Sequence, residues 1–148
     1  GNREFVLAAA KRNAHALQYA ADELRKDRDF VLTAIRLNKR NLKFASREVQ
    51  EDKAFVLVAV QQNWRVLEYA LDRLKKDRDV VMAAVKQNGY ALQYAARELK
   101  RDRGIVLAAM QENTDAVAYA EGVLQSEEEI VLAIVQQKIN QQSLRKNK

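Results

Sequence analysis

An asparagine recurs every 25 residues along the chain, and this period orders the rest of the sequence. Six residues after each of these asparagines stands a tyrosine or phenylalanine, which an alanine follows. An acidic residue closes each unit, and no insertion or deletion interrupts five consecutive units. Self-similarity at a fixed period in this range is the sequence signature of repeat architectures. The recurring asparagines are Asn13, Asn38, Asn63, Asn88 and Asn113.

Each unit is predicted to form two short helices joined by a turn. In the second unit, Asp27 is placed to cap a helix over residues 28–37, which has apolar side chains on most sides. Asn38 is expected to end this helix in the left-handed conformation that asparagine tolerates. A second helix is expected over residues 40–50, where apolar residues recur at helical spacing. The asparagine, aromatic and acidic rows are interpreted as structural, namely as buried amides that satisfy turn backbone, as core rings and as helix caps.

Helices of about 10 residues are not stable alone in water, so neighbouring units must bury a shared core. The chain is therefore predicted to be all-α, an α-solenoid or superhelical stack of 25-residue helix-turn-helix repeats that forms one domain over residues 1–148. Lys138 replaces the asparagine of the sixth unit, which is then either a capping helix or a frayed end. The full repeats are 3–27, 28–52, 53–77, 78–102 and 103–127, and the partial C-terminal repeat is 128–148.

The segment over residues 77–95, DRDVVMAAVKQNGYALQYA, resembles a tandem repeat family catalogued as a domain of unknown function. Its signature reads D-R-x-x-V-L-x-A-V-x-x-N-G-x-A-L-x-Y-A, and the likeness covers residues 3–138. The resemblance implies a helical repeat array and no established catalytic activity. Because such repeats occur in bacterial proteins delivered into host cells, it also implies an interaction role. Departures from the signature are Lys39, Trp64 and Thr114 at the glycine position and Lys138 at the asparagine position.

The residue types that carry out catalysis and metal binding are scarce. The chain has no cysteine and only one histidine, His15, which is expected to be an exposed turn residue. No phosphate-binding glycine loop or nucleophile elbow is present. The sequence therefore predicts a protein that is not an enzyme and that binds no cofactor and no metal.

The sequence contains no apolar run near the ~20 residues that span a bilayer, and no signal-peptide pattern. A cytoplasmic protein is expected, or one delivered into a host cytosol as part of a bacterial effector. Asn2 falls where the repeat places its helix-capping residue. The chain is therefore expected to be a fragment of a longer protein.

Candidate binding residues are those at which otherwise similar repeats disagree. The two positions after each asparagine vary most, and the stack should bring these turns together along one edge. Trp64 with neighbouring arginines would form an aromatic and basic stripe there, and these residue types are enriched at binding hot spots. A second variable row lies two residues before each asparagine. The candidates for partner binding are His15, Lys39, Arg40, Trp64, Arg65 and Tyr90 on the edge, and Lys11, Arg36 and Lys86 on the second row.

These observations favour a non-enzymatic scaffold that presents the variable edge to a protein partner. The net charge of +6 favours an acidic partner. The alternative is binding of nucleic acid, in particular RNA, by a basic helical array. Against it, the variable positions carry no repeated polar code, and residues 103–127 hold one basic and four acidic side chains. Binding to an anionic membrane surface is a third class, although no apolar face for insertion is evident.

Overall fold

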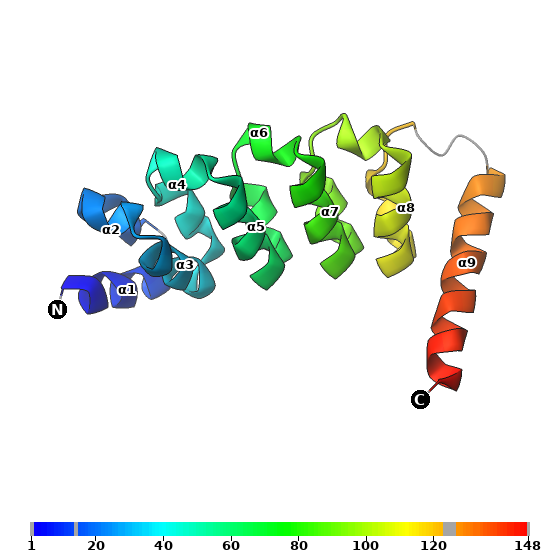
Figure 1. Cartoon of the computed structure of the whole chain (residues 1–148), viewed down its shortest axis with the longest axis horizontal. Coiled ribbons are helices and arrows are strands. Elements are labelled where there is room, and N and C mark those ends of the chain that lie inside the picture. The colour runs from blue at the N-terminus through cyan, green and yellow to red at the C-terminus, as the bar shows by residue number, and fades with distance from the viewer. Residues whose placement is uncertain (1, 14, 123–126, 148) are drawn as a thin grey trace. The chain divides into compact units, whose positions relative to one another are not determined.

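The computed structural model describes residues 2–13, 15–122 and 127–147, and every regular element in these ranges is helical. The chain divides into two compact units, residues 1–74 and 75–148, called here the N-terminal and C-terminal units. Figure 1 labels the α-helices of both units in chain order. The helices of the N-terminal unit are α1 (Asn2–Arg12), η1 (Ala16–Tyr19), α2 (Asp22–Lys26), α3 (Arg28–Leu37), η2 (Lys39–Phe44), α4 (Arg47–Glu51), α5 (Lys53–Gln62) and η3 (Trp64–Tyr69), where η denotes a 3₁₀ helix. Helix α6 (Asp72–Lys75) crosses the boundary, and the C-terminal unit holds α7 (Arg78–Gln87), η4 (Gly89–Tyr94), η5 (Leu99–Arg101), α8 (Arg103–Glu112), η6 (Thr114–Tyr119) and α9 (Glu127–Lys146).

In the second to fifth repeats the first helix begins at the predicted residue, and its aspartate cap explains why. The Asp27 carboxylate accepts a hydrogen bond from the backbone N–H of Phe30 at 2.9 Å. Asp52 and Asp102 make the same bond to the residue three positions on. Each bond satisfies a backbone donor that the first helical turn leaves unpaired. The prediction of acidic helix caps is confirmed for Asp27, Asp52, Asp77 and Asp102, while the side chain of Glu127 lies outside the described residues.

The expectation that asparagine ends this helix in a left-handed conformation is wrong. Asn38 is extended, with φ −156° and ψ 115°, and no described residue other than glycine has a positive φ. Instead, the Asn38 side-chain oxygen accepts a hydrogen bond from the backbone N–H of Arg40 at 3.0 Å. Asn63 and Asn88 bond in the same way to the residue two positions on. The asparagine therefore follows the end of the first helix and caps the start of the 3₁₀ helix after it. The side chain of Asn38 is half-buried, whereas a buried amide was expected.

The second half of the repeat also differs from the single α-helix expected over residues 40–50. It consists of the 3₁₀ helix η2, an extended residue Ala45 and the separate helix α4. The backbone N–H of Ser46 donates to the carbonyl of Arg25 in the preceding repeat at 2.8 Å, not to a carbonyl of its own helix. Ala96 and Glu121 make equivalent bonds to the repeat before them. A hydrogen bond between repeats thus replaces a helical one and divides the segment.

The core of each unit is formed by the first helices and the middle of the 3₁₀ helices. Val31, Leu42 and Val56 are buried in the N-terminal unit, as Val81 and Leu92 are in the C-terminal unit. Within the N-terminal unit η2 packs against η3, so the 3₁₀ helices of successive repeats lie side by side.

The aromatic row, expected in the core, lies at its rim. Tyr19 is 83% exposed, so the expectation is wrong for this residue. Phe44, Tyr69, Tyr94 and Tyr119 are half-buried. The buried positions of the 3₁₀ helices are instead taken by the smaller apolar residues, which leaves these rings at the surface.

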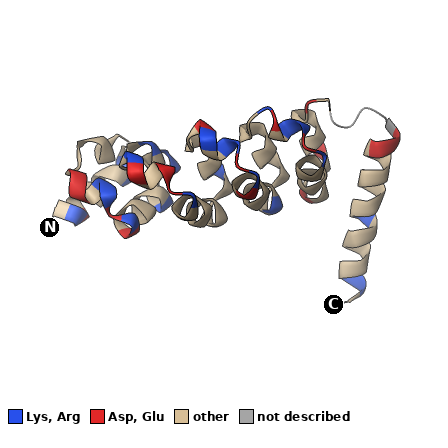
Figure 2. Cartoon of the chain, turned by 45° about the horizontal axis from the view of Figure 1, so that its top comes forward, with Lys and Arg blue, Asp and Glu red and all other residues tan. Residues whose placement is uncertain are grey.

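Charged residues link the start of one repeat to the start of the next. Arg3 pairs with Asp27 at 2.7 Å and Arg28 with Asp52 at 2.6 Å in the N-terminal unit. Figure 2 shows acidic and basic segments next to one another along the ribbon of both units. Exposed pairs of this kind contribute about 0–1 kcal/mol each, so they support the stack without holding it together. The corresponding pairs of the C-terminal unit are Arg78–Asp102 and Arg103–Glu129.

The sixth repeat lacks the turn that divides the others. Lys138 stands at the asparagine position, and α9 continues through it as one helix to Lys146. Among the described residues, no 3₁₀ helix follows α9 to cover its apolar side. Val131 and Val135 are therefore 54% and 46% exposed, whereas Val106, which corresponds to Val131 in the preceding repeat, is fully buried.

One buried polar side chain interrupts the core of the N-terminal unit. Asn41 is fully buried, and its amide nitrogen donates to the carbonyl of Ala34 at 2.8 Å. Its side-chain oxygen has no hydrogen-bond partner among the described residues. An unpaired buried acceptor costs on the order of 1–3 kcal/mol. The equivalent residue of the next repeat is Val66, so an apolar side chain fits this position.

Replacing Asn41 with valine is therefore expected to raise the free energy of unfolding by about 1–2 kcal/mol. The Ala34 carbonyl keeps its backbone partner, because the N–H of Asn38 also donates to it at 2.9 Å. The change is measured as an increase in the urea concentration at the midpoint of unfolding. If the variant unfolds at a lower urea concentration than the unmodified chain, the hydrogen bond of the Asn41 amide stabilises the fold by more than its unpaired oxygen destabilises it.

Candidate functional site

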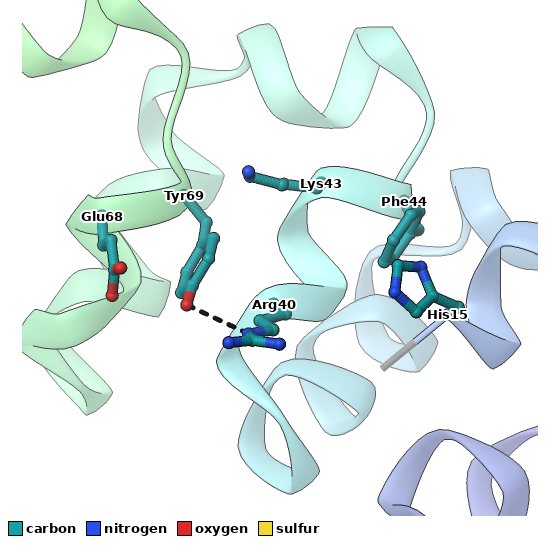
Figure 3. A pocket seen from close by; sticks show the side chains of 6 residues that line it. All are labelled: His15, Arg40, Lys43, Phe44, Glu68 and Tyr69. Carbon is teal, nitrogen blue, oxygen red and sulfur yellow. Dashed lines mark hydrogen bonds between the residues drawn. The ribbon is translucent and has the colours of Figure 1, made fainter. Parts of the chain in front are cut away.

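An open hollow of about 290 Å³ lies over the 3₁₀ helices of the N-terminal unit (Figure 3). Its walls come from three successive repeats, because η1, η2 and η3 pack in order. The hollow combines cationic groups, aromatic rings and one carboxylate. It is lined by His15, Arg40, Lys43, Phe44, Glu68 and Tyr69.

The 3₁₀ geometry of η2 brings its two cations to the same side. Residues three apart eclipse one another in a 3₁₀ helix, whereas an α-helix would offset them. Arg40 and Lys43 are three apart and both line the hollow. The Asn38 cap on the N–H of Arg40 fixes the first turn of this helix. The repeated asparagine, although structural, thereby positions the two cations.

Three cationic side chains surround Tyr69. The Nε of Arg40 donates a hydrogen bond to the Tyr69 hydroxyl at 3.2 Å (Figure 3). The ammonium of Lys43 lies 5.3 Å from the centre of the Tyr69 ring, and that of Lys39 lies 5.9 Å from it. These distances are within the range of cation–π attraction. One phenol ring thus holds three cationic side chains in place.

Glu68 offsets part of this charge. Its carboxylate lies 3.7 Å from the ammonium of Lys39. Three cations and one carboxylate leave two positive charges around the ring. The hydrogen bond to Tyr69 also raises the pKa of Arg40 above its ordinary value, so the guanidinium stays charged at any physiological pH. The hollow therefore favours an anionic ligand.

The opposite wall is aromatic. The ring of His15 lies 5.2 Å from the ring of Phe44, at an interplanar angle of 59°. Phe44 is half-buried and His15 is exposed. Figure 3 shows both rings across the hollow from Glu68. This wall offers a ligand apolar ring surface beside the cations.

The structure brings several of the sequence-predicted residues together. His15 and Arg40 line the hollow, and Lys39 lies at its edge over the Tyr69 ring. Trp64 and Arg65 begin the neighbouring helix η3, where the Arg65 guanidinium lies 4.6 Å from the Trp64 ring centre. Trp64 is half-buried and Arg65 is exposed.

The other predicted residues lie away from the hollow. Tyr90 belongs to the C-terminal unit, where its ring meets that of Tyr119 edge-on at 6.3 Å. Arg36 is exposed on α3, and its Nε donates to the side-chain oxygen of Gln62 at 2.9 Å. Lys11 and Lys86 are exposed near the ends of α1 and α7.

Four residues of the hollow are not among the predicted contacts: Lys43, Phe44, Glu68 and Tyr69. Both rings are expected in the core, and Lys43 and Glu68 lie outside the two variable rows. A signal for Lys43 and Glu68 was nevertheless present in the repeat. The fifth position after each asparagine changes character from one repeat to the next, as the second position does. Its residues are Gln18, Lys43, Glu68, Gln93 and Ala118.

The described residues contain no group of three or more His, Cys, Asp or Glu side chains that could hold a metal ion. In the same ranges, no helix has both the length and the apolar character needed to cross a membrane.

Comparison with known proteins places the repeat in a family. No curated protein and no solved structure matches the chain. The model of one family matches twice in tandem, over residues 2–50 and 52–100, and each match spans about two of the repeats. Together the matches cover more than half of the chain. The chain therefore belongs to the family described as "Domain of unknown function (DUF4116)".

Proposed function

We propose that this chain is a non-enzymatic scaffold that binds a protein partner through the 3₁₀ helices of its N-terminal unit. The observation that carries the proposal is a set of basic and aromatic side chains on the adjacent helices η2 and η3. Tryptophan, tyrosine and arginine are the residue types most enriched at interface hot spots. The set, called here the basic–aromatic surface, consists of Lys39, Arg40, Lys43, Trp64, Arg65 and Tyr69.

Two features support this assignment. First, the repeat core does not require these side chains, since the positions of Lys39 and Trp64 hold glycine and threonine in later repeats. Second, cation–π contacts and the Arg40–Tyr69 hydrogen bond hold several of them before any partner arrives. Side chains ordered in advance lose less conformational entropy on binding. The family resemblance extends the proposal to a binding module of a protein delivered into a host cell.

Replacing Trp64 and Arg65 together with alanine is expected to weaken partner binding at least about tenfold, the usual effect of removing hot-spot side chains. Proteins captured by the unmodified chain and lost from the double variant would be purified. Their dissociation constants for both chains would then be measured by calorimetry. The melting temperature is expected to change little, because both side chains lie at the surface rather than in the core.

The matched control is Arg47→Ala with Glu48→Ala on α4, which removes one cation and one acid from exposed positions off the basic–aromatic surface. This control should bind the partner as the unmodified chain does. A large fall in melting temperature in the Trp64 and Arg65 variant would place Trp64 in the core and remove the main support for the proposal.

RNA binding is the second candidate, because arginine beside aromatic rings can stack bases. Salt dependence separates the two functions. Each phosphate contact releases counterions, so the logarithm of the association constant for RNA would fall linearly with the logarithm of salt concentration. We expect binding of single-stranded RNA to be weak at physiological salt, and tight binding with a steep salt slope would favour this second function.

A further inference from the structure

The equivalent repeat positions in the C-terminal unit lack the charged side chains of the hollow. Arg40 and Tyr69 correspond in the repeat to Tyr90 and Tyr119, which meet edge-on at 6.3 Å. The repeat packing therefore accepts an uncharged ring where Arg40 stands. The remaining charged positions of the hollow are replaced in the same way: Lys39 by Gly89, Lys43 by Gln93 and Glu68 by Ala118.

Arg40 is oriented to receive an anion. Its Nε is used by the Tyr69 hydroxyl, whereas its two terminal nitrogens make no hydrogen bond within the described residues. Two terminal nitrogens in this geometry match the two oxygens of a carboxylate or phosphate. Lys43 lines the same hollow, and its ammonium is engaged there by the Tyr69 ring alone among the described residues. A second positive charge is thus available to the same anion.

We propose that the hollow binds one oxyanion, a carboxylate or phosphate group, carried by a side chain of an extended segment of the protein partner. This inference rests on the proposed function, since it identifies the chemistry by which the basic–aromatic surface recognises that partner. Arg40 and Lys43 contact the anion, and the rings of Phe44 and Tyr69 pack against the carbon atoms next to it. The hollow, at about 290 Å³, is at the lower end of ligand pockets. It therefore admits one side chain with adjoining backbone, not a folded surface.

The position of Glu68 favours a peptide over a nucleic acid. Its carboxylate lines the hollow and pairs with Lys39, so one of the three cations is already partly neutralised. A strand with a phosphate at every nucleotide would bring further negative charge against Glu68. A peptide can place a single anion on Arg40 and uncharged residues near Glu68, which costs no such repulsion.

The test uses the full chain and three nine-residue peptides, blocked at both ends, that differ only at the central residue. Each has glycine and serine at the flanking positions and glutamate, phosphoserine or glutamine at the centre. Affinities are measured from amide chemical-shift changes at low and at physiological salt. We expect at least one anionic peptide to bind about tenfold or more tightly than the glutamine peptide, with changes centred on Arg40, Lys43 and Tyr69. The glutamate and phosphoserine arms show which oxyanion the hollow takes.

Arg40→Tyr with Lys43→Gln is the decisive variant, because it reproduces the residues that the C-terminal unit carries at equivalent positions. It should melt within a few degrees of the unmodified chain and lose the preference for the anionic peptide. Glu68→Ala, which reproduces Ala118, should bind the same peptide several-fold more tightly. An increase in affinity cannot arise from a variant that has failed to fold.

Equal affinity for all three peptides, or a preference that survives the decisive variant, would overturn the assignment of the hollow. Tighter binding of a single-stranded RNA of equal length, lost in the same variant, would overturn the assignment to a peptide. These failures are distinguishable from failure of the proposed function. A partner that still depends on Trp64 and Arg65 would leave the scaffold role intact while the oxyanion site is rejected.

Discussion

Replacing Gly89 with alanine is expected to destabilise the C-terminal unit by about 3 kcal/mol, at the upper end of the usual cost of overpacking. A Cβ at this position would lie 2.1 Å from the carbonyl oxygen of Ala109 on helix α8 and 3.2 Å from the Cβ of Ala116. The carbonyl oxygen belongs to the backbone, so this clash can be relieved only if η4 and α8 move apart. Gly89 has no positive φ, and its role is close approach between elements rather than turn formation.

Gly104→Ala is the matched control in the same unit. Its added Cβ would meet the end of the Arg78 side chain at 2.7 Å, and this flexible group can move away. Because alanine favours a helix over glycine by up to about 1 kcal/mol, the control should be neutral or slightly stabilising. Urea unfolding of both variants measures the difference. Similar free energies of unfolding for the two would show that η4 and α8 are not in close contact.

Removing the aspartate caps of the N-terminal unit together is expected to lower its free energy of unfolding by about 2–4 kcal/mol. Each cap contributes about 1–2 kcal/mol, and caps in separate repeats should act additively. The variant is Asp27→Ala with Asp52→Ala. Asp22→Ala serves as the control, because this carboxylate is exposed and its ion pair is with Arg25 of the same helix. A loss no larger than that of the control would show that the caps do not define the helix starts.

The same caps predict how stability depends on pH. The N–H of Phe30, with Arg3 second, lowers the pKa of Asp27 below its ordinary value of 3.8. Arg28, with the N–H of Phe55 second, does the same for the pKa of Asp52. A group whose pKa is lower in the folded state stabilises the fold above its unfolded pKa. Stability should therefore be constant near neutral pH and fall as the pH drops below about 3.8.

Asparagine variants separate the charge of these caps from their hydrogen bonds. Asn caps a helix about as well as Asp but does not titrate in this range. Asp27→Asn with Asp52→Asn should therefore stay close to the unmodified chain at pH 7 and lose less stability between pH 4 and 2. If the variant loses as much stability between pH 4 and 2 as the unmodified chain, the acid sensitivity comes from other carboxylates.

The sequence was sufficient to predict the features that depend on local interactions. The bounds of the first helices and the aspartate caps depend on residues at most a few positions apart. Asp27 reaches only to Phe30, for example. The expected edge also included His15 and Arg40, because differences between repeats at fixed positions are visible without a structure.

The features that depend on contacts between repeats could not be predicted. The bond from Ser46 to Arg25 joins residues that are distant in sequence, and it divides the segment expected to be one α-helix. The resulting 3₁₀ geometry aligns Lys43 directly with Arg40 along the helix. The exposure of Tyr19 is of the same kind, since the aromatic position is half-buried in later repeats. The residues next to an aromatic ring in the sequence do not show whether another repeat covers that ring.

The claim on which the site depends is that an asparagine-capped 3₁₀ helix replaces a continuous second α-helix. The Cα chemical shifts of the full chain test it most directly. We expect extended values at Asn38 and Ala45 that bracket helical values over residues 39–44, in agreement with their backbone angles. Unbroken helical values from residue 40 to 50, or a left-handed Asn38, would contradict the account.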